Sequence, residues 1–233
     1  MHALLDLLLP AGCAGCAAPG SPWCPDCAVL LGPPVRVFPP CFSLVDAPPV
    51  YALGVYRGPL RTALLAYKEK GRRDLGGPFG DALAAALLRL APGSGGLCLV
   101  PVPSRRLAAA RRGGQHVALL ARRAAAALAG AGRETAVAPA LRMAAGVRDS
   151  VGLRAAARQA NLAGRVLPRR AGLPPTGTPV VLVDDVVTTG ATAMACATAL
   201  LRAGVDTPAI VVLAAAGCHA TSRRSGRGDH SQC

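Results

Sequence analysis

The chain is most constrained at residues 180–192, where a short apolar run leads into two aspartates and a threonine-rich loop. Residues 180–183 are Val-Val-Leu-Val, as expected of a strand that helices cover on both faces. Gly190 and the alanine-rich stretch after it predict a turn into a helix over 191–203, which ends near Gly204. A buried strand, a loop and a helix in this order form one unit of an α/β fold.

The same alternation of short apolar runs and alanine-rich stretches extends over most of the chain. It predicts a parallel sheet flanked by helices. The predicted strands are 51–56, 97–100, 179–183 and 208–214. The predicted helices are 59–68, 81–90, 115–129, 152–161 and 191–203.

Composition divides the chain into four zones. Residues 1–32 hold four of the nine cysteines and predict a small zinc-binding module. Residues 33–49 contain six prolines, which cannot continue a helix or a central strand, and predict a stiff linker or an irregular wrap. Residues 50–217 form the predicted α/β domain, and residues 218–233, with little apolar content, predict a disordered tail.

The loop after the buried strand carries groups that match a ribose phosphate. Asp184 and Asp185 can accept hydrogen bonds from two vicinal hydroxyls. The hydroxyls of Thr188, Thr189 and Thr192, with free N–H groups at the start of the next helix, suit a phosphate. The alternative is an ordinary buried strand that ends in solvated carboxylates and a threonine helix cap.

The four N-terminal cysteines follow a C-x2-C-x7-C-x2-C pattern, and they are Cys13, Cys16, Cys24 and Cys27. Two such pairs can close a tetrahedral thiolate site for Zn²⁺ with no open position for catalysis. Two disulfides or free thiols are the alternatives. The opening residues make a poor signal peptide, so we expect a cytoplasmic protein in which thiols stay reduced, and this favours structural zinc.

The formal net charge is +14, and nearly all of it comes from arginine. A basic surface attracts phosphates, but a coding bias that replaces lysine by arginine would give the same composition. Aromatic residues make up only 3% of the chain, which argues against base stacking. No stretch reaches the roughly 18 apolar residues of a membrane span, so we expect no membrane insertion.

At the 184–192 loop the chain resembles the type I phosphoribosyltransferases, which bind phosphoribosyl pyrophosphate (PRPP). The resemblance implies that Asp184 and Asp185 hold the ribose hydroxyls and act in catalysis, and that Mg²⁺ is held mainly by the substrate. It implies that the 5-phosphate is cradled by Thr188, Thr189, Gly190, Ala191 and Thr192. The pyrophosphate loop is then represented by Ser104, Arg105 and Arg106, and a flexible lid by residues 110–116.

In such a lid, Arg112, or its neighbour Arg111, could neutralise charge on departing pyrophosphate. Lys68 is a further basic candidate for substrate binding. Solvated loop arginines are the alternative to these roles.

The cysteine module, the proline-rich join and the phosphoribosyltransferase-like domain together resemble the ComF family, which is associated with DNA uptake in natural competence. The resemblance is carried by Tyr56-Arg-Gly-Pro-Leu60, Tyr67-Lys68, Val100-Pro-Val-Pro103, Arg112-Gly113, Ala157-Arg-Gln-Ala-Asn161 and Asp184-Asp-Val-Val-Thr-Thr-Gly-Ala-Thr192. Two motifs depart from the family. Its usual Arg-Gly-Phe-Asn-Gln is Arg112-Gly-Gly-Gln-His116 here, and Ser150 stands in place of a glutamine.

The ComF resemblance implies a protein that binds PRPP with Mg²⁺ and takes part in DNA uptake. Its implied partners are single-stranded DNA and helicase-type competence proteins. A phosphoribosyltransferase of nucleotide or related metabolism stays open as an alternative, and so does a PRPP-responsive single-stranded nucleic-acid-binding protein without turnover. The segment 141–168, which is expected to cover the reacting carbon, carries no clear purine or pyrimidine signature.

Overall fold

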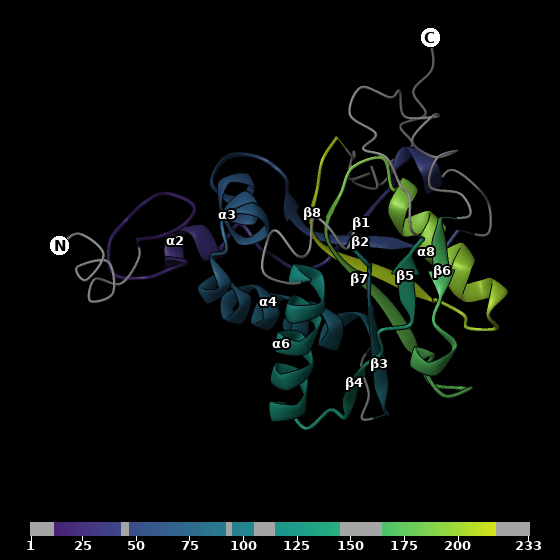
Figure 1. Ribbon diagram of the computed structural model, residues 1–233. Coiled ribbons are helices and arrows are strands. Elements are labelled where there is room, and N and C mark those ends of the chain that lie inside the picture. The colour runs from purple at the N-terminus through teal and green to yellow at the C-terminus, as the bar shows by residue number, and fades with distance from the viewer. Residues whose placement is uncertain (1–11, 43–46, 92–94, 105–114, 145–164, 218–233) are drawn as a thin grey trace, which may run out of the picture.

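The computed structural model describes residues 12–42, 47–91, 95–104, 115–144 and 165–217. In these residues a six-stranded sheet lies between two layers of helices (Figure 1). Its strands, in spatial order, are β1 (Val35–Val37), β2 (Val50–Val55), β8 (Ala209–Ala215), β7 (Val180–Val187), β3 (Leu97–Pro101) and β4 (Thr135–Val137). Neighbouring strands from β2 to β4 are parallel, whereas β1 is antiparallel to β2. The expected parallel sheet is therefore mostly parallel but mixed.

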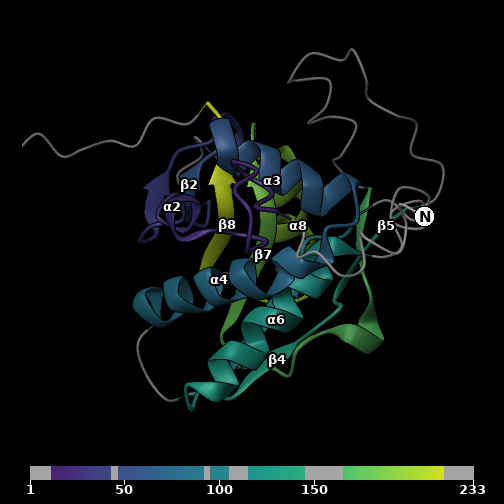
Figure 2. The same cartoon turned by 90° about the vertical axis from the view of Figure 1, so that its left-hand side faces the viewer.

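Helices cover both faces of the sheet. The helices are α2 (Pro25–Ala28), α3 (Gly58–Glu69), α4 (Gly76–Leu90), α6 (His116–Gly130) and α8 (Ala191–Arg202). Figure 2 shows α3, α4 and α6 in front of one face, and Figure 1 shows α8 on the other. Each layer buries its apolar side chains against the sheet: Phe79 and Leu120 belong to one core cluster, and Leu182 and Leu200 to the other. None of the described helices has the length and apolar character to cross a lipid bilayer.

A small two-stranded sheet packs beside α8. Its strands are β5 (Leu141–Met143) and β6 (Val166–Pro168), which pair antiparallel. Leu141 and Val166 contribute to the core cluster on the α8 side. Three single turns of 3-10 helix complete the described elements: η1 (Pro40–Phe42), η2 (Arg73–Leu75) and η3 (Arg170–Gly172).

Several predicted boundaries are wrong. Strand β7 does not end at Val183 but continues to Val187, because residues 186 and 187 keep their pairing with β8. Helix α4 begins at Gly76 and not at residue 81, since a proline is tolerated in the first turn of a helix. The predicted helix 152–161 and the predicted tail 218–233 lie outside the described residues.

The proline-rich segment 33–49 is more regular than a linker. It contains β1, which lies at the edge of the sheet, where flanking prolines are tolerated. Beyond β1, the backbone N–H of Cys41 donates a hydrogen bond of 2.9 Å to the carbonyl of Thr189. The segment therefore wraps around the sheet edge and contacts the threonine loop.

The cysteine module packs directly onto α3 and α4. Its Cys13, Trp23 and Cys27 are buried in the same core cluster as Phe79. Two hydrogen bonds to backbone carbonyls fix the module on the domain, from Gly32 to Leu53 (2.9 Å) and from the Arg72 guanidinium to Gly12 (3.1 Å). The module and the α/β domain therefore share one core.

Candidate functional site

The carboxyl ends of β3 and β7 meet at a switch point of the sheet. Strand β7 continues through α8 to β8 on one side, whereas the neighbouring β3 leads through α6 to β4 on the other. Helices α8 and α6 lie on opposite faces, because their apolar residues belong to different core clusters. Ligands of open α/β sheets bind at such points. The predicted ribose-phosphate loop follows β7 at this edge, and Ser104, the first residue of the predicted pyrophosphate loop, follows β3.

Among the described charged residues at this edge, Asp185 is the most enclosed, with only 3% of its surface exposed. Its Oδ2 lies 3.0 Å from His116 Nε2 and 3.2 Å from Lys68 Nζ. The structure thus brings together two predicted site residues from β7 and α3, and adds a histidine from α6. An ionised carboxylate is only an acceptor, so the histidine tautomer that fits carries its proton on Nε2.

Asp184 and Asp185 are adjacent but differ in their surroundings. Burial, and then the negative charge of Asp185, raise the pKa of Asp184 well above its usual value. Burial alone would also raise the pKa of Asp185, but the hydrogen bond from His116 and the charge of Lys68 outweigh it and lower that pKa. The pair therefore favours a proton on Asp184 and a negative charge on Asp185.

The threonine loop forms a tight turn into α8. Gly190 has a left-handed backbone, with φ of 81°, and stands at the N-cap of the helix. Such a conformation favours glycine, because a Cβ would crowd the backbone. The Thr189 hydroxyl accepts a 3.4 Å hydrogen bond from the N–H of Ala191. The loop therefore aims the amino end of α8, with its positive dipole, at the carboxyl end of β7.

The predicted pyrophosphate loop begins at the end of β3. The N–H of Ser104 donates a hydrogen bond of 3.4 Å to Gln115 Oε1, next to the start of α6. The Ser104 hydroxyl is buried and has no partner among the described residues. The predicted anchors Arg105 and Arg106 and the predicted lid residue Arg112 lie outside the described residues.

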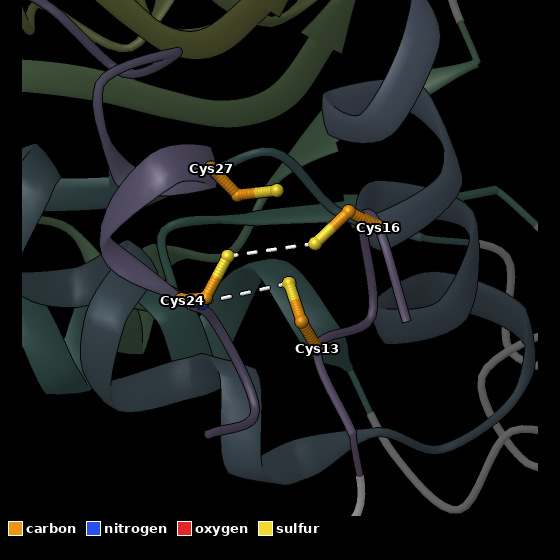
Figure 3. Close-up of side chains that lie close together, drawn as sticks. All are labelled: Cys13, Cys16, Cys24 and Cys27. Carbon is orange, nitrogen blue, oxygen red and sulfur yellow. Dashed lines mark hydrogen bonds between the residues drawn. The ribbon is translucent and has the colours of Figure 1, made fainter. Parts of the chain in front are cut away.

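The four cysteines of the N-terminal module come together in space (Figure 3). Their Sγ atoms all lie within 4.8 Å of one another, and those of Cys16 and Cys24 are 3.5 Å apart. The described cysteines are all free, so the predicted alternative of two disulfides does not describe this arrangement. Four thiols at these distances could hold a metal ion.

The pKa values of the Cys13 and Cys27 thiols are shifted in opposite directions. Burial raises the pKa of Cys13, but backbone N–H groups outweigh it and lower that pKa to about 6. Burial, and then the neighbouring thiols, raise the pKa of Cys27 far above its ordinary value. The group cannot ionise completely by itself, and a bound cation would relieve the repulsion among thiolates.

His116 is the last residue of the predicted lid 110–116, but the structure buries it at the start of α6, and the sequence patterns do not reveal its contact with Asp185. It lies 69 positions from Asp185 in the chain, and its side chain is buried at the start of an apolar helix. A polar residue on a buried helix face is a weak signal, because such a histidine is more often a satisfied core residue. Tyr67 supports it from α3, where the phenol donates a hydrogen bond of 2.9 Å to the His116 carbonyl.

A cavity of about 390 Å³ opens at the other end of β7. Residues 173–180, 203–206 and 208 line it, four of them prolines, and Asp206 is the one charged residue among these described lining residues. A phosphate would meet a negative charge there and no basic group. The candidate site is therefore at the carboxyl end of β7.

The described residues define an α/β protein with a mostly parallel sheet and an acidic, threonine-rich site at its switch point. Four close cysteines that could bind a metal ion such as zinc form a second site. No protein-family model matches the chain, and no match is found among the curated proteins. The function is therefore inferred from the chemistry of the two sites.

Proposed function

We propose that this protein binds PRPP together with Mg²⁺ at the carboxyl ends of β3 and β7. The observation that carries the proposal is one arrangement: the Asp184–Asp185 pair stands directly before the Gly190 turn and the amino end of α8, at the switch point of the sheet. A ribose phosphate has a diol at one end and an anion at the other, and the arrangement offers a complement to each.

The two aspartates complement the ribose diol. Each hydroxyl can donate one hydrogen bond and accept others. The raised pKa of Asp184 and the lowered pKa of Asp185 favour one neutral and one ionised carboxyl. The pair then supplies a donor as well as acceptors, and the ionised member makes the stronger hydrogen bonds.

The start of α8 complements the 5-phosphate. Backbone N–H groups of residues 190–192 and the hydroxyls of Thr188, Thr189 and Thr192 are the proposed donors. Ala191 has a small side chain, which does not hold a phosphate away from the helix end. The hydrogen bond from Cys41 to the Thr189 carbonyl supports the loop from behind.

The proposed pyrophosphate anchors are Ser104, Arg105, Arg106 and Lys68. The Lys68 side chain is 36% exposed, so its ammonium can reach both Asp185 and a ligand. Mg²⁺ keeps several waters and few protein ligands, and it would arrive bound to the pyrophosphate oxygens.

A transferase would add one chemical step. A nucleophile would form a bond to the anomeric carbon while the bond from that carbon to pyrophosphate breaks. The electron pair of the broken bond would leave with pyrophosphate. Arg112 is the proposed residue that neutralises this charge, and the other groups act by position and charge alone.

The resemblance to the ComF family extends the proposal to DNA uptake. The formal net charge of +14 supports polyanionic partners, which here would be single-stranded DNA and helicase-type competence proteins.

We also propose that the cysteine module holds a structural Zn²⁺. Tetrahedral Zn–S bonds of about 2.3 Å place sulfur atoms roughly 3.8 Å apart. The four Sγ atoms are already near this spacing, since all pairs lie within 4.8 Å. Four thiolates fill the coordination shell and leave no position for a substrate.

The PRPP proposal is tested by calorimetric titration of PRPP with Mg²⁺ into the wild type and into Asp185→Asn. Loss of a charged hydrogen-bond acceptor is expected to weaken binding by about 10- to 100-fold. The matched control is Asp206→Asn, which changes a carboxylate at the opposite end of the sheet and should leave the affinity unchanged. Equal affinities of Asp185→Asn and the wild type, or no binding by the wild type, would contradict the proposal.

A further inference from the structure

A continuous line of four buried rings joins the cysteine module to Asp185. The line runs through Trp23, Phe79, Tyr67 and His116. The successive ring centroids are 5.5, 5.6 and 6.1 Å apart, with interplanar angles of 78°, 80° and 79°. Each pair is thus in the edge-to-face geometry that aromatic rings prefer.

Each end of the line of rings lies next to one of the two candidate sites. At one end, a Cβ added to Gly15 would lie 2.9 Å from Cys27 Sγ and 2.9 Å from the Trp23 ring, so the ring and a candidate metal ligand bound the same narrow space. At the other end, His116 Nε2 lies 3.0 Å from Asp185 Oδ2. The line therefore spans the distance between the two candidate sites.

The connection at Tyr67 is the most restrained part of the line. Its phenol donates to the His116 carbonyl at 2.9 Å, while its ring contacts the His116 side chain. Burial raises the pKa of Tyr67 to about 12, which keeps the phenol a neutral donor. His116 Nδ1 has no partner among the described residues. The contact with Asp185 is therefore the one polar contact of the imidazole among these residues.

We propose that the cysteine module positions Asp185 through this line of rings. Close-packed interiors transmit small displacements, because a shifted ring moves its neighbour or leaves a void. Release of the metal would free the segment that carries Trp23, and the shift would reach His116 through Phe79 and Tyr67. The four rings are positioning residues, and the inference that they affect PRPP rests on the proposed function.

The first experiment compares PRPP affinity in Phe79→Leu and in Leu128→Ala, each with zinc bound. Both residues are fully buried in the same core cluster, but Leu128 lies near the end of α6, whereas His116 begins that helix, and Leu128 is a member of none of the three ring pairs. Phe79→Leu is expected to weaken PRPP binding by about three- to tenfold, and Leu128→Ala to leave it unchanged. Removal of zinc from the wild type should weaken PRPP binding by a similar factor. In Phe79→Leu, removal of zinc should weaken PRPP binding by a smaller factor.

The second experiment does not depend on PRPP. The ¹⁵N-labelled imidazole groups are observed by NMR, and His116→Gln assigns the His116 Nε2–H signal. Zinc removal and Phe79→Leu should each shift this signal, whereas Leu128→Ala should not, and zinc re-addition should restore the wild-type position.

The outcomes separate the two proposals. A wild type that does not bind PRPP overturns the proposed function, while the NMR signal still decides on the line of rings. If the His116 signal and the PRPP affinity are unchanged in folded Phe79→Leu, the positioning role is wrong. Should the zinc-free protein unfold, Phe79→Leu with zinc bound remains decisive.

Discussion

At the scale of single residues, Asp184 and Asp185 occupy different environments although they are neighbours in the chain. Asp185 is held by His116 and Lys68, which favour its negative charge. The Oδ1 of Asp184 accepts the N–H of Asp185 at 2.9 Å, and no cation is within salt-bridge distance of it among the described residues. The raised pKa of Asp184 is therefore a cost to the ligand-free fold at neutral pH.

The first prediction is that Asp184→Asn stabilises the ligand-free protein at pH 7. A carboxyl with a raised folded-state pKa contributes stability below its unfolded pKa, about 3.9, and loses that contribution as the pH rises through the folded pKa. Asparagine mimics the neutral acid and can still accept the Asp185 N–H. We expect a gain in Tm of about 2–4 °C, or about 1 kcal/mol, by calorimetry.

The pH dependence is the control for this prediction. The gain should shrink towards zero below about pH 3, where the wild-type residue is protonated in both states. An equal gain at about pH 3 and at pH 7 would mean that charge is not its origin.

The residues of the site could be predicted from the sequence only in part. The two aspartates and the threonine loop form a contiguous motif, and Lys68 is the last residue of a predicted helix. The contact between His116 and Asp185 could not be predicted, because it depends on how α6 starts relative to β7, and 69 positions separate the two residues.

At the scale of elements, the start of α8 depends on one backbone conformation. Gly190, with φ of 81°, turns the chain from β7 into the helix, and Gly204, with φ of 78°, ends it. The two glycines flank the same helix but only the first faces the proposed phosphate.

The second prediction compares Gly190→Ala with Gly204→Ala. Each alanine is forced into a left-handed conformation, which costs about 1–2 kcal/mol of stability. Only Gly190→Ala should also displace the helix start, and we expect its PRPP affinity to fall by at least about tenfold. Denaturant unfolding measures the stability of both, and calorimetry the affinity; equal affinities in the two variants would refute the assignment of the loop.

The long elements are those that the sequence predicts well. Helices α3, α6 and α8 lie within two residues of their predicted bounds, since each shows an apolar face over three turns or more. Strands β1, β4, β5 and β6 have three residues each, which is too short for an alternating pattern to be recognised. Their pairing is decided by tertiary contacts.

At the scale of the whole molecule, the cysteine module and the α/β domain behave as one body. Cys13, Trp23 and Cys27 are part of the core that α3 and α4 build against the sheet. The amino-acid composition changes at residue 32, but the hydrophobic core continues across this position.

The third prediction is that zinc removal lowers the stability of the entire chain in a single transition. A ligand present at about 1,000 times its Kd contributes about 4 kcal/mol, which corresponds to about 8–16 °C in Tm for a domain of this size. The fluorescence of Trp23, the only tryptophan, reports on the module, and far-UV circular dichroism reports on the domain. The two curves should coincide with and without zinc, and separate midpoints would contradict a shared core.

The position of β8 in the sheet also governs how the protein can be made. This strand is synthesised after both β2 and β7, yet it lies between them and pairs with both. Until residues 209–215 emerge, β2 and β7 each expose an unpaired edge that can associate with other chains. A nascent chain of this protein therefore cannot complete its sheet until β8 has emerged, and a product truncated before β8 is a target for chaperones and proteases.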